Sequence, residues 1–151
     1  MKSKRRSPPG ATERLRIVLV VDTNVVAYLL IEGDRTRDAQ ALYTLDPEWK
    51  SEAFLLIEFS NILATYERSA DLTRSQAEAL LATAESRLRG LIALPHRVAL
   101  EHARRFGVSA YDARFLAVAE RLRSPLVTED ARLRAAAPSL TRSIAEALME
   151  R

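Results

Sequence analysis

The run of five apolar residues from Ile17 to Val21 limits the fold more than any other feature of this sequence. A strand with one face in water alternates apolar and polar residues, whereas a continuous apolar run is typical of a parallel sheet covered on both faces. The run ends at Asp22, where a helical pattern begins. We therefore expect a parallel strand with helices packed on both sides of its sheet.

The rest of the chain alternates between strand and helix patterns. Asp34 is the N-cap that we predict for the second helix, and Thr73 and Gln76 have the spacing of a capping box. We predict further strands at residues 49–53, 91–94 and 125–128. We predict helices at residues 24–30, 34–45, 55–69, 73–89, 95–105, 109–123, 129–136 and from about 143. This alternation indicates an α/β domain with a mainly parallel sheet.

The composition excludes several classes of site and of location. The chain of 151 residues has no cysteine, which excludes disulfides and thiolate metal sites, and its two histidines disfavour histidine-rich metal centres. Its longest uninterrupted apolar stretch, Val25–Ile31, is far too short to span a bilayer. The N-terminal residues lack the apolar segment of a secretory signal. We expect a soluble cytoplasmic protein.

The net charge of +3 originates in the N-terminal residues. Residues 1–10 carry four basic side chains and no acid, which leaves 19 basic and 20 acidic side chains in residues 11–151. We expect residues 1–15 to form a disordered basic leader and residues 16–151 to form one folded domain. The leader has three interpretations: a contact with nucleic-acid phosphates, a segment without function, or a start codon placed too far upstream.

Four carboxylates stand where a charged side chain is normally absent. Asp22 and Asp130 follow predicted strands, while Glu58 and Asp112 lie on the apolar faces of predicted helices. Buried carboxylates need a partner, and no obvious basic residue stands beside any of the four. Hard oxygen ligands of this kind suit Mg²⁺ or Mn²⁺. Because ligands gather at the carboxyl ends of parallel strands, we expect Asp22 and Asp130 at one edge of the sheet.

Each of these acids also has a structural interpretation. Asp22 has the position of a helix cap, and Asp130 that of a first-turn acid which complements the helix dipole. Ser109 and Asp112 have the spacing of an acidic capping box. Glu58 is the hardest to explain structurally, because its helical neighbours are apolar. The four acids together are therefore stronger evidence for a site than any one of them.

Other classes that use strand-end aspartates lack their further residues here. Phosphatases with a nucleophilic aspartate need a second acid two positions on, where this chain has Asn24. Receiver domains need paired acids after the first strand, and both classes need a lysine near a later strand. The four glycines are isolated, which excludes a phosphate-binding glycine loop. No histidine pair is placed for metal-free acid–base cleavage.

Four segments resemble, in order and spacing, the motifs of PIN-domain ribonucleases, and most closely those of VapC-type toxins of bacterial toxin–antitoxin pairs. They are Val20–Asn24, Leu56–Leu63, Ser109–Leu122 and Leu126–Asp130. The resemblance covers residues 17–135 and implies a three-layer α/β/α fold around a mainly parallel sheet of four or five strands. The basic leader departs from the pattern, because such toxins usually begin close to the first strand.

The resemblance also implies an activity and partners. The implied enzyme is a metal-dependent endoribonuclease that cleaves RNA with a metal-activated water, forms a homodimer and is blocked by a cognate antitoxin. The implied ligands of one or two Mg²⁺ or Mn²⁺ ions are Asp22, Glu58, Asp112 and Asp130, with Thr128 and Asn24 in support. From the helical spacing we add Asn61 as a hydrogen-bonding neighbour of Glu58, and we rank Glu129 below Asp130 as a ligand.

Two alternatives remain at this stage. The chain is either a nuclease or a non-catalytic PIN-like module that binds RNA or protein; clustered acids disfavour the module, because they repel phosphates. Apolar residues on the early helices either form the groove that receives the antitoxin or belong to the core. These residues are Tyr28, Leu29, Leu42 and Tyr43.

Overall fold

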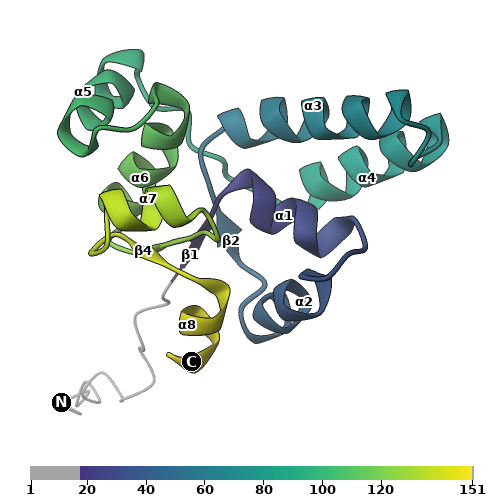
Figure 1. The fold of residues 1–151 in the computed structure, drawn as a ribbon, viewed down its shortest axis with the longest axis horizontal. Helices are drawn as coiled ribbons and strands as arrows, with labels where there is room; N and C mark the ends of the chain where they lie inside the picture. The colour runs from purple at the N-terminus through teal and green to yellow at the C-terminus, as the bar shows by residue number, and fades with distance from the viewer. Residues whose placement is uncertain (1–17, 151) are drawn as a thin grey trace, which may run out of the picture.

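A computed structural model describes residues 18–150, which form a mixed α/β domain around one parallel sheet (Figure 1). The strands are β1 (Leu19–Val21), β2 (Trp49–Lys50), β3 (Leu126–Val127) and β4 (Thr141–Arg142), in the spatial order β2-β1-β3-β4. Every neighbouring pair in this order is parallel. The predicted parallel sheet of four or five strands is therefore confirmed. The predicted leader and Ile17 lie outside the described residues.

Strand β1 is the centre of the sheet. Val20 is in register with Lys50 of β2 on one side and with Leu126 of β3 on the other. The side chains of β1 are buried on both faces of the sheet, and Val20 and Val21 have no exposed surface. Over Leu19–Val21 the apolar run therefore has the cause that we predicted, because helices cover both faces.

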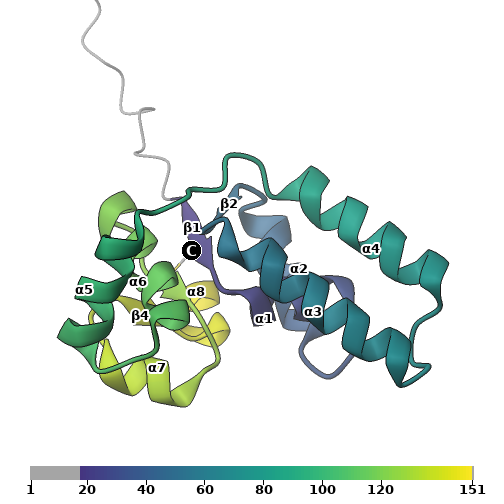
Figure 2. The ribbon, with the colours of Figure 1, turned by 90° about the horizontal axis from the view of Figure 1, so that it is seen from above.

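The helices lie on both sides of this sheet, as Figure 2 shows from above. Helices α1, α2, α3 and α4 form one group, and α5, α6 and α7 lie on the other side, where α6 packs on β1 and β3. Helix α8 contacts α2 and β4. Their bounds are α1 (Thr23–Leu30), α2 (Thr36–Leu45), α3 (Phe54–Arg68), α4 (Arg74–Arg87), α5 (His96–Phe106), α6 (Ala110–Leu122), α7 (Ala131–Ala136) and α8 (Ile144–Met149).

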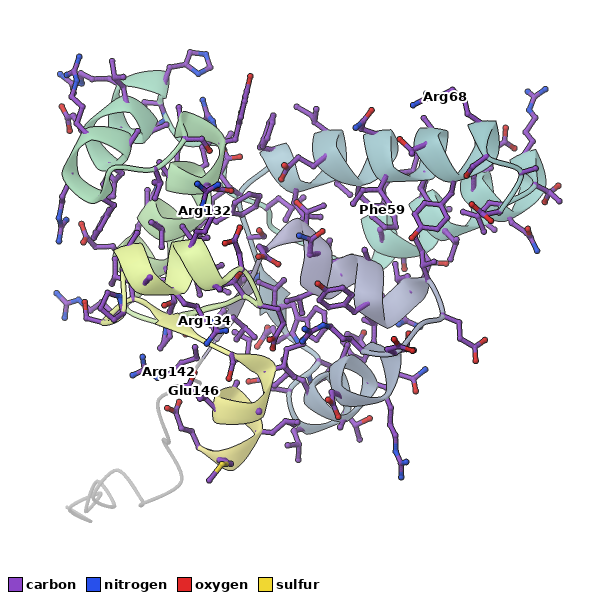
Figure 3. All side chains as sticks on the ribbon, viewed as in Figure 1. Phe59, Arg68, Arg132, Arg134, Arg142 and Glu146 are labelled. Atoms are coloured by element: carbon purple, nitrogen blue, oxygen red, sulfur yellow. The ribbon has the colours of Figure 1, made fainter. Side chains whose placement is uncertain are left out.

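Helices α3 and α4 form an antiparallel hairpin that extends away from the sheet in both views (Figures 1 and 2). Figure 3 shows Phe59 on the α1 side of α3, where its ring is fully buried. The predicted capping box starts α4, because the Thr73 hydroxyl accepts from the Gln76 N–H while the Gln76 amide oxygen accepts from the Thr73 N–H. The buried Phe59 ring therefore anchors the middle of α3 in the core, where α3 contacts α1.

One predicted strand does not form, and one strand that does form was not predicted. Residues 91–94 form only a single parallel bridge, between Ile92 and Glu52. The ladder stops there because the Leu94 N–H donates to the Glu52 carboxylate, at 3.1 Å, and not to a neighbouring strand. The strand that was not predicted is β4, which follows Pro138 and is too short to show a periodic pattern in the sequence.

The predicted cap of the second helix is also wrong, because α2 begins at Thr36 and not after Asp34. The Thr36 hydroxyl accepts from the Gly33 N–H at 2.9 Å and donates to the Ile31 carbonyl at 3.1 Å. This hydroxyl fixes the turn between α1 and α2 without the Asp34 side chain. No helix within residues 18–150 is long and apolar enough to cross a membrane.

Candidate active site

Asp22 stands where β1 becomes α1, and it is almost completely buried, with 7% of its surface exposed. Its Oδ1 accepts from the Val25 N–H at 3.1 Å, so the side chain caps α1 as its structural interpretation predicted. Its Oδ2 accepts from the Thr128 hydroxyl at 2.5 Å, across from the end of β3. These two hydrogen bonds therefore fix the Asp22 carboxylate at the edge of the sheet.

Burial raises the pKa of Asp22 to about 6, although the hydrogen bonds from Thr128 and Val25 lower it. The negative charges of Glu58 and Asp112 raise the same pKa further. Asp22 is therefore a buried anion whose partners are neutral donors and whose charged neighbours repel it. A positive charge from outside the chain would remove this penalty.

Glu58 reaches the same region from α3. It is half-buried, and its Oε1 accepts from the Thr23 hydroxyl at 2.7 Å. Burial raises the pKa of Glu58, and the charge of Asp112 adds to this, while the Thr23 bond lowers it. Thr23 was not among the supporting residues predicted from the sequence. Its position directly after Asp22, at the end of the strand, was the available signal.

Asp112 lies in the first turn of α6. The Ser109 hydroxyl caps that helix by accepting from the Asp112 N–H at 3.0 Å, so the Ser109 half of the predicted box is formed. Burial raises the pKa of Asp112, and the charge of Asp130 raises it further. Burial and the nearby Asp130 charge therefore both disfavour the charged form of Asp112.

One pocket of about 450 Å³ brings these residues together. Three of the four predicted acids line it, each from a different element: the end of β1, α3 and α6. The predicted supporting amides of Asn24 and Asn61 line it too. Its apolar lining was not predicted and consists of Phe54, Ile57, Ile62, Tyr111 and Phe115. The pocket thus pairs an acidic region with an aromatic and aliphatic one.

Asp130 is placed differently. Its side chain is exposed and is not part of the pocket lining; its Oδ1 caps α7 by accepting from the Arg132 and Leu133 N–H groups at 2.9 and 3.0 Å. Its own N–H donates to the Thr128 hydroxyl at 3.1 Å. Thr128 therefore links the Asp130 backbone to the Asp22 carboxylate, and the Asp130 charge reaches the pocket through its effect on Asp112.

Glu129, the lower-ranked ligand, is engaged elsewhere. Its Oε1 accepts from the Ile144 N–H at 2.8 Å, and its Oε2 forms an ion pair with Arg35 at 2.9 Å. These bonds join the loop after β3 to α8 and to the turn before α2. Glu129 therefore has a structural task that uses both carboxylate oxygens.

The acids of the site have no basic partner within residues 18–150. None of the ion pairs in this part of the chain includes Asp22, Glu58, Asp112 or Asp130. Figure 3 shows Arg132 rising from the first turn of α7 on the side of α6, but its exposed guanidinium forms no ion pair with them. The negative charge of the site is therefore not neutralised by the described chain.

The described residues contain no group of three acidic or histidine side chains close enough together to hold a metal ion as they stand. The donor chemistry nevertheless fits a hard divalent cation, because every polar group of the pocket offers oxygen and none offers sulfur or imidazole. The Thr128 hydroxyl holds Asp22 and the Thr23 hydroxyl holds Glu58, while Asp112 is half-buried and borders the same pocket.

Comparison with known proteins identifies the family of this chain. Residues 19–138 match the PIN domain. The crystal structure of PAE2754 from Pyrobaculum aerophilum is similar to this chain, with a TM-score of 0.72 over 89% of this chain and 94% of that chain. The two sequences are 20% identical, so this likeness shows a shared fold. Curated proteins gave no match to this sequence.

Proposed function

The chain belongs to the PIN-domain family, whose members are generally metal-dependent nucleases, and we propose that it is an endoribonuclease that hydrolyses RNA phosphodiester bonds with Mg²⁺ or Mn²⁺. One observation carries the proposal. Three carboxylates, from the end of β1, from α3 and from α6, line one pocket, and none has a basic partner in the described chain. Their negative charge is therefore not offset, and binding of a cation would be favourable. A non-catalytic module has no such observation in its favour.

Asp22, Glu58 and Asp112 would hold the ion, and Asp130, which lies outside the pocket lining, is the fourth proposed ligand. A bound divalent ion would supply a water of lowered pKa and would stabilise charge on the phosphate oxygens. The chain's own residues set the ligand positions: the Thr128 hydroxyl orients Asp22, and the Thr23 hydroxyl orients Glu58. The amides of Asn24 and Asn61 line the same pocket and offer N–H donors to a phosphate oxygen.

The two histidines do not supply a competing mechanism. His102 lies between α5 and α6, where its ring nitrogens face the Val98 carbonyl and Glu120 at 2.9 and 3.2 Å. His96 receives a hydrogen bond from Arg114 at 2.7 Å. Neither residue lines the acidic pocket, so general acid–base cleavage by a histidine pair has no support there.

The biological role is proposed from the order of the four motifs: a cytoplasmic toxin of a toxin–antitoxin pair that works as a homodimer. Only two of the four residues suggested for the antitoxin groove are accessible in this fold. Leu29 and Leu42 are buried and belong to the core, while Tyr28 and Tyr43 are only partly buried. An antitoxin segment would therefore meet the two tyrosines and not an aliphatic stripe.

The activity is tested by incubating the purified full-length protein with unstructured RNA in Mg²⁺ or Mn²⁺ and separating the products. We expect cleavage that EDTA abolishes and that Asp22→Asn and Asp112→Asn each reduce by at least about a hundredfold, since they remove ligand charge. Asp38→Asn is the matched control, because Asp38 is an exposed acid on α2. Cleavage that persists in EDTA, or in both site variants, would contradict the proposal.

A further inference from the structure

Two aromatic rings meet at the mouth of the acidic pocket. Phe54 begins α3 and Tyr111 lies in the first turn of α6, and their rings stack almost parallel, with 5.2 Å between centroids and 7° between planes. Both residues line the pocket. Phe54 is packed against the core, so it holds the Tyr111 ring from behind in one orientation. The pair is therefore a rigid aromatic surface beside the carboxylates.

The outer side of this pair is open to water. Tyr111 is 61% exposed, and Ile57, one helical turn from Phe54 on α3, is 65% exposed. Both line the pocket, although large apolar side chains exposed to this degree are few among the described residues. An apolar side chain that stays exposed to water does not stabilise the folded state. Exposed apolar patches commonly mark binding sites.

We propose that the Tyr111 ring, backed by Phe54, is a stacking platform for an unpaired nucleobase next to the phosphodiester bond that the enzyme cleaves. This inference rests on the proposed function and names a subsite for it. Tyr111 directly precedes Asp112 in the chain, so the ring and a carboxylate of the site stand at neighbouring positions of one helical turn. A nucleotide has the same arrangement, with a flat base attached close to its phosphate.

The surroundings of the ring favour a base over other occupants. Every base has a π-face, and base stacking on exposed aromatic side chains is a general means of holding single-stranded nucleic acid. Asn24 and Asn61 are exposed and line the same pocket, so their amides can donate to and accept from a base edge. A second copy of the chain on this face would instead bury the acids further and increase their repulsion.

The platform also selects for unpaired RNA. A base in a duplex has both faces covered by its neighbours, so it must leave the stack before it can lie on Tyr111. We therefore expect single strands, loops or bulges to be cleaved and continuous duplex to resist cleavage. Since stacking tolerates all four bases, the ring fixes the position of the nucleotide more than its identity.

The test is a double-mutant cycle between Tyr111 and one base of the substrate. The cleavage position in a short unstructured RNA oligonucleotide is mapped first, and the oligonucleotide is then made with an abasic nucleotide on either side of that bond. We expect Tyr111→Ala to lower kcat/KM by roughly 5- to 150-fold on intact RNA. One abasic substitution should cause a similar loss in the parent protein and little further loss in Tyr111→Ala.

Two control variants separate stacking from other roles. Tyr111→Phe keeps the ring and should show the parent's sensitivity to the abasic nucleotide, unlike Tyr111→Ala. Leu100→Ala removes an exposed apolar side chain from α5, away from the pocket, and should change neither kcat/KM nor this sensitivity. Light scattering on the same variants measures whether the face joins two copies of the chain.

The outcomes distinguish the two proposals. If the parent cleaves no RNA with either metal, the proposed function fails and the platform fails with it. If the parent cleaves but the losses from Tyr111→Ala and from both abasic substitutions multiply, the function stands and the platform is wrong. The platform is equally wrong if Tyr111→Ala converts a dimer to a monomer while abasic RNA is cleaved normally, because the face is then an interface between copies.

Discussion

Two buried carboxylates at the same edge of the sheet have opposite surroundings. Asp22 follows β1 and Glu52 follows β2, and both are nearly inaccessible to water. Glu52 accepts from the Arg114 guanidinium and the Leu94 N–H at 3.1 Å each, and from the Phe54 N–H at 2.5 Å. Among residues 18–150, Asp22 accepts only from neutral donors. The described residues therefore neutralise the Glu52 anion and supply no cation to Asp22.

This difference separates a folding role from a ligand-binding role. The Glu52–Arg114 ion pair joins the loop before α3 to α6, and it closes the sheet edge where residues 91–94 fail to extend the ladder. Asp22 instead lines a pocket together with two further acids, Glu58 and Asp112. A buried charge that is fully paired indicates structure, whereas a group of unpaired charges indicates a site for something positive.

The largest effect is expected from breaking the internal ion pair. Arg114→Met leaves Glu52 buried without its cation, which typically destabilises a protein by about 3–5 kcal/mol. The free energy of unfolding from urea titration measures this loss. Arg121→Met is the matched control, because Arg121 is exposed on the same helix, and it should stay within about 0.5 kcal/mol of the parent. A small effect of Arg114→Met would mean that the two carboxylates do not differ as described.

Asp22→Asn should act in the opposite direction and stabilise the metal-free protein. The amide still accepts from Val25 and can donate to the Thr128 hydroxyl, while the buried charge is gone. The pKa of Asp22 is raised from 3.8 to about 6, which corresponds to about 2–3 kcal/mol above pH 6. Urea titration in EDTA measures the gain, and a loss of stability would show that the Asp22 charge supports the fold.

The raised pKa of Asp22 also makes the stability of the fold depend on pH. Between about pH 4 and 6 the folded protein holds a proton on Asp22 that the unfolded chain has released, so stability falls as pH rises through this window. Glu58 and Asp112, whose pKa values are also raised, add to the same slope. In Asp22→Asn the slope should be shallower. Thermal melting across this pH range in EDTA measures the slope. An unchanged slope in Asp22→Asn would show that a group other than Asp22 causes the pH dependence.

The smallest effect is expected at Asp130, whose side chain caps α7 from an exposed position. Asp130→Asn keeps the cap and should leave the free energy of unfolding within about 0.5 kcal/mol, whereas Asp130→Ala removes it and should destabilise by about 1 kcal/mol. Cleavage should fall in both variants, because both remove the charge. Full activity in Asp130→Asn would remove this residue from the proposed ligand set.

The sequence predicted the central parallel strand better than it predicted local boundaries. The apolar run before Asp22 identified the central strand, because burial on both faces leaves a pattern in the residues themselves. The strand ends then indicated which acids share an edge. The helix begins at Thr36 and not after Asp34 because the Thr36 hydroxyl bonds Gly33 and Ile31 in the preceding turn, and the sequence pattern does not rank such short polar side chains.

Contacts between distant segments were not predictable in this way. Glu52 follows a strand as Asp22 does, but its partner Arg114 is 62 positions away on α6, so the sequence does not show that its charge is paired. Phe54 and Tyr111 meet only because the fold brings the start of α3 to the start of α6. One sequence without the fold identifies an acid as unusual, but it does not show whether its partner lies within the chain.

The most direct test is thermal melting of the full-length protein at about pH 7.5, with and without Mn²⁺, for the parent, Asp22→Asn and Asp38→Asn. If the acidic pocket takes up the cation that residues 18–150 do not supply, Mn²⁺ stabilises the parent and Asp38→Asn by about 2.7 kcal/mol at a hundredfold excess over Kd. Asp22→Asn should melt higher than the parent in EDTA and gain little from Mn²⁺. An equal Mn²⁺ shift in all three proteins, or no shift in the parent, would contradict this account.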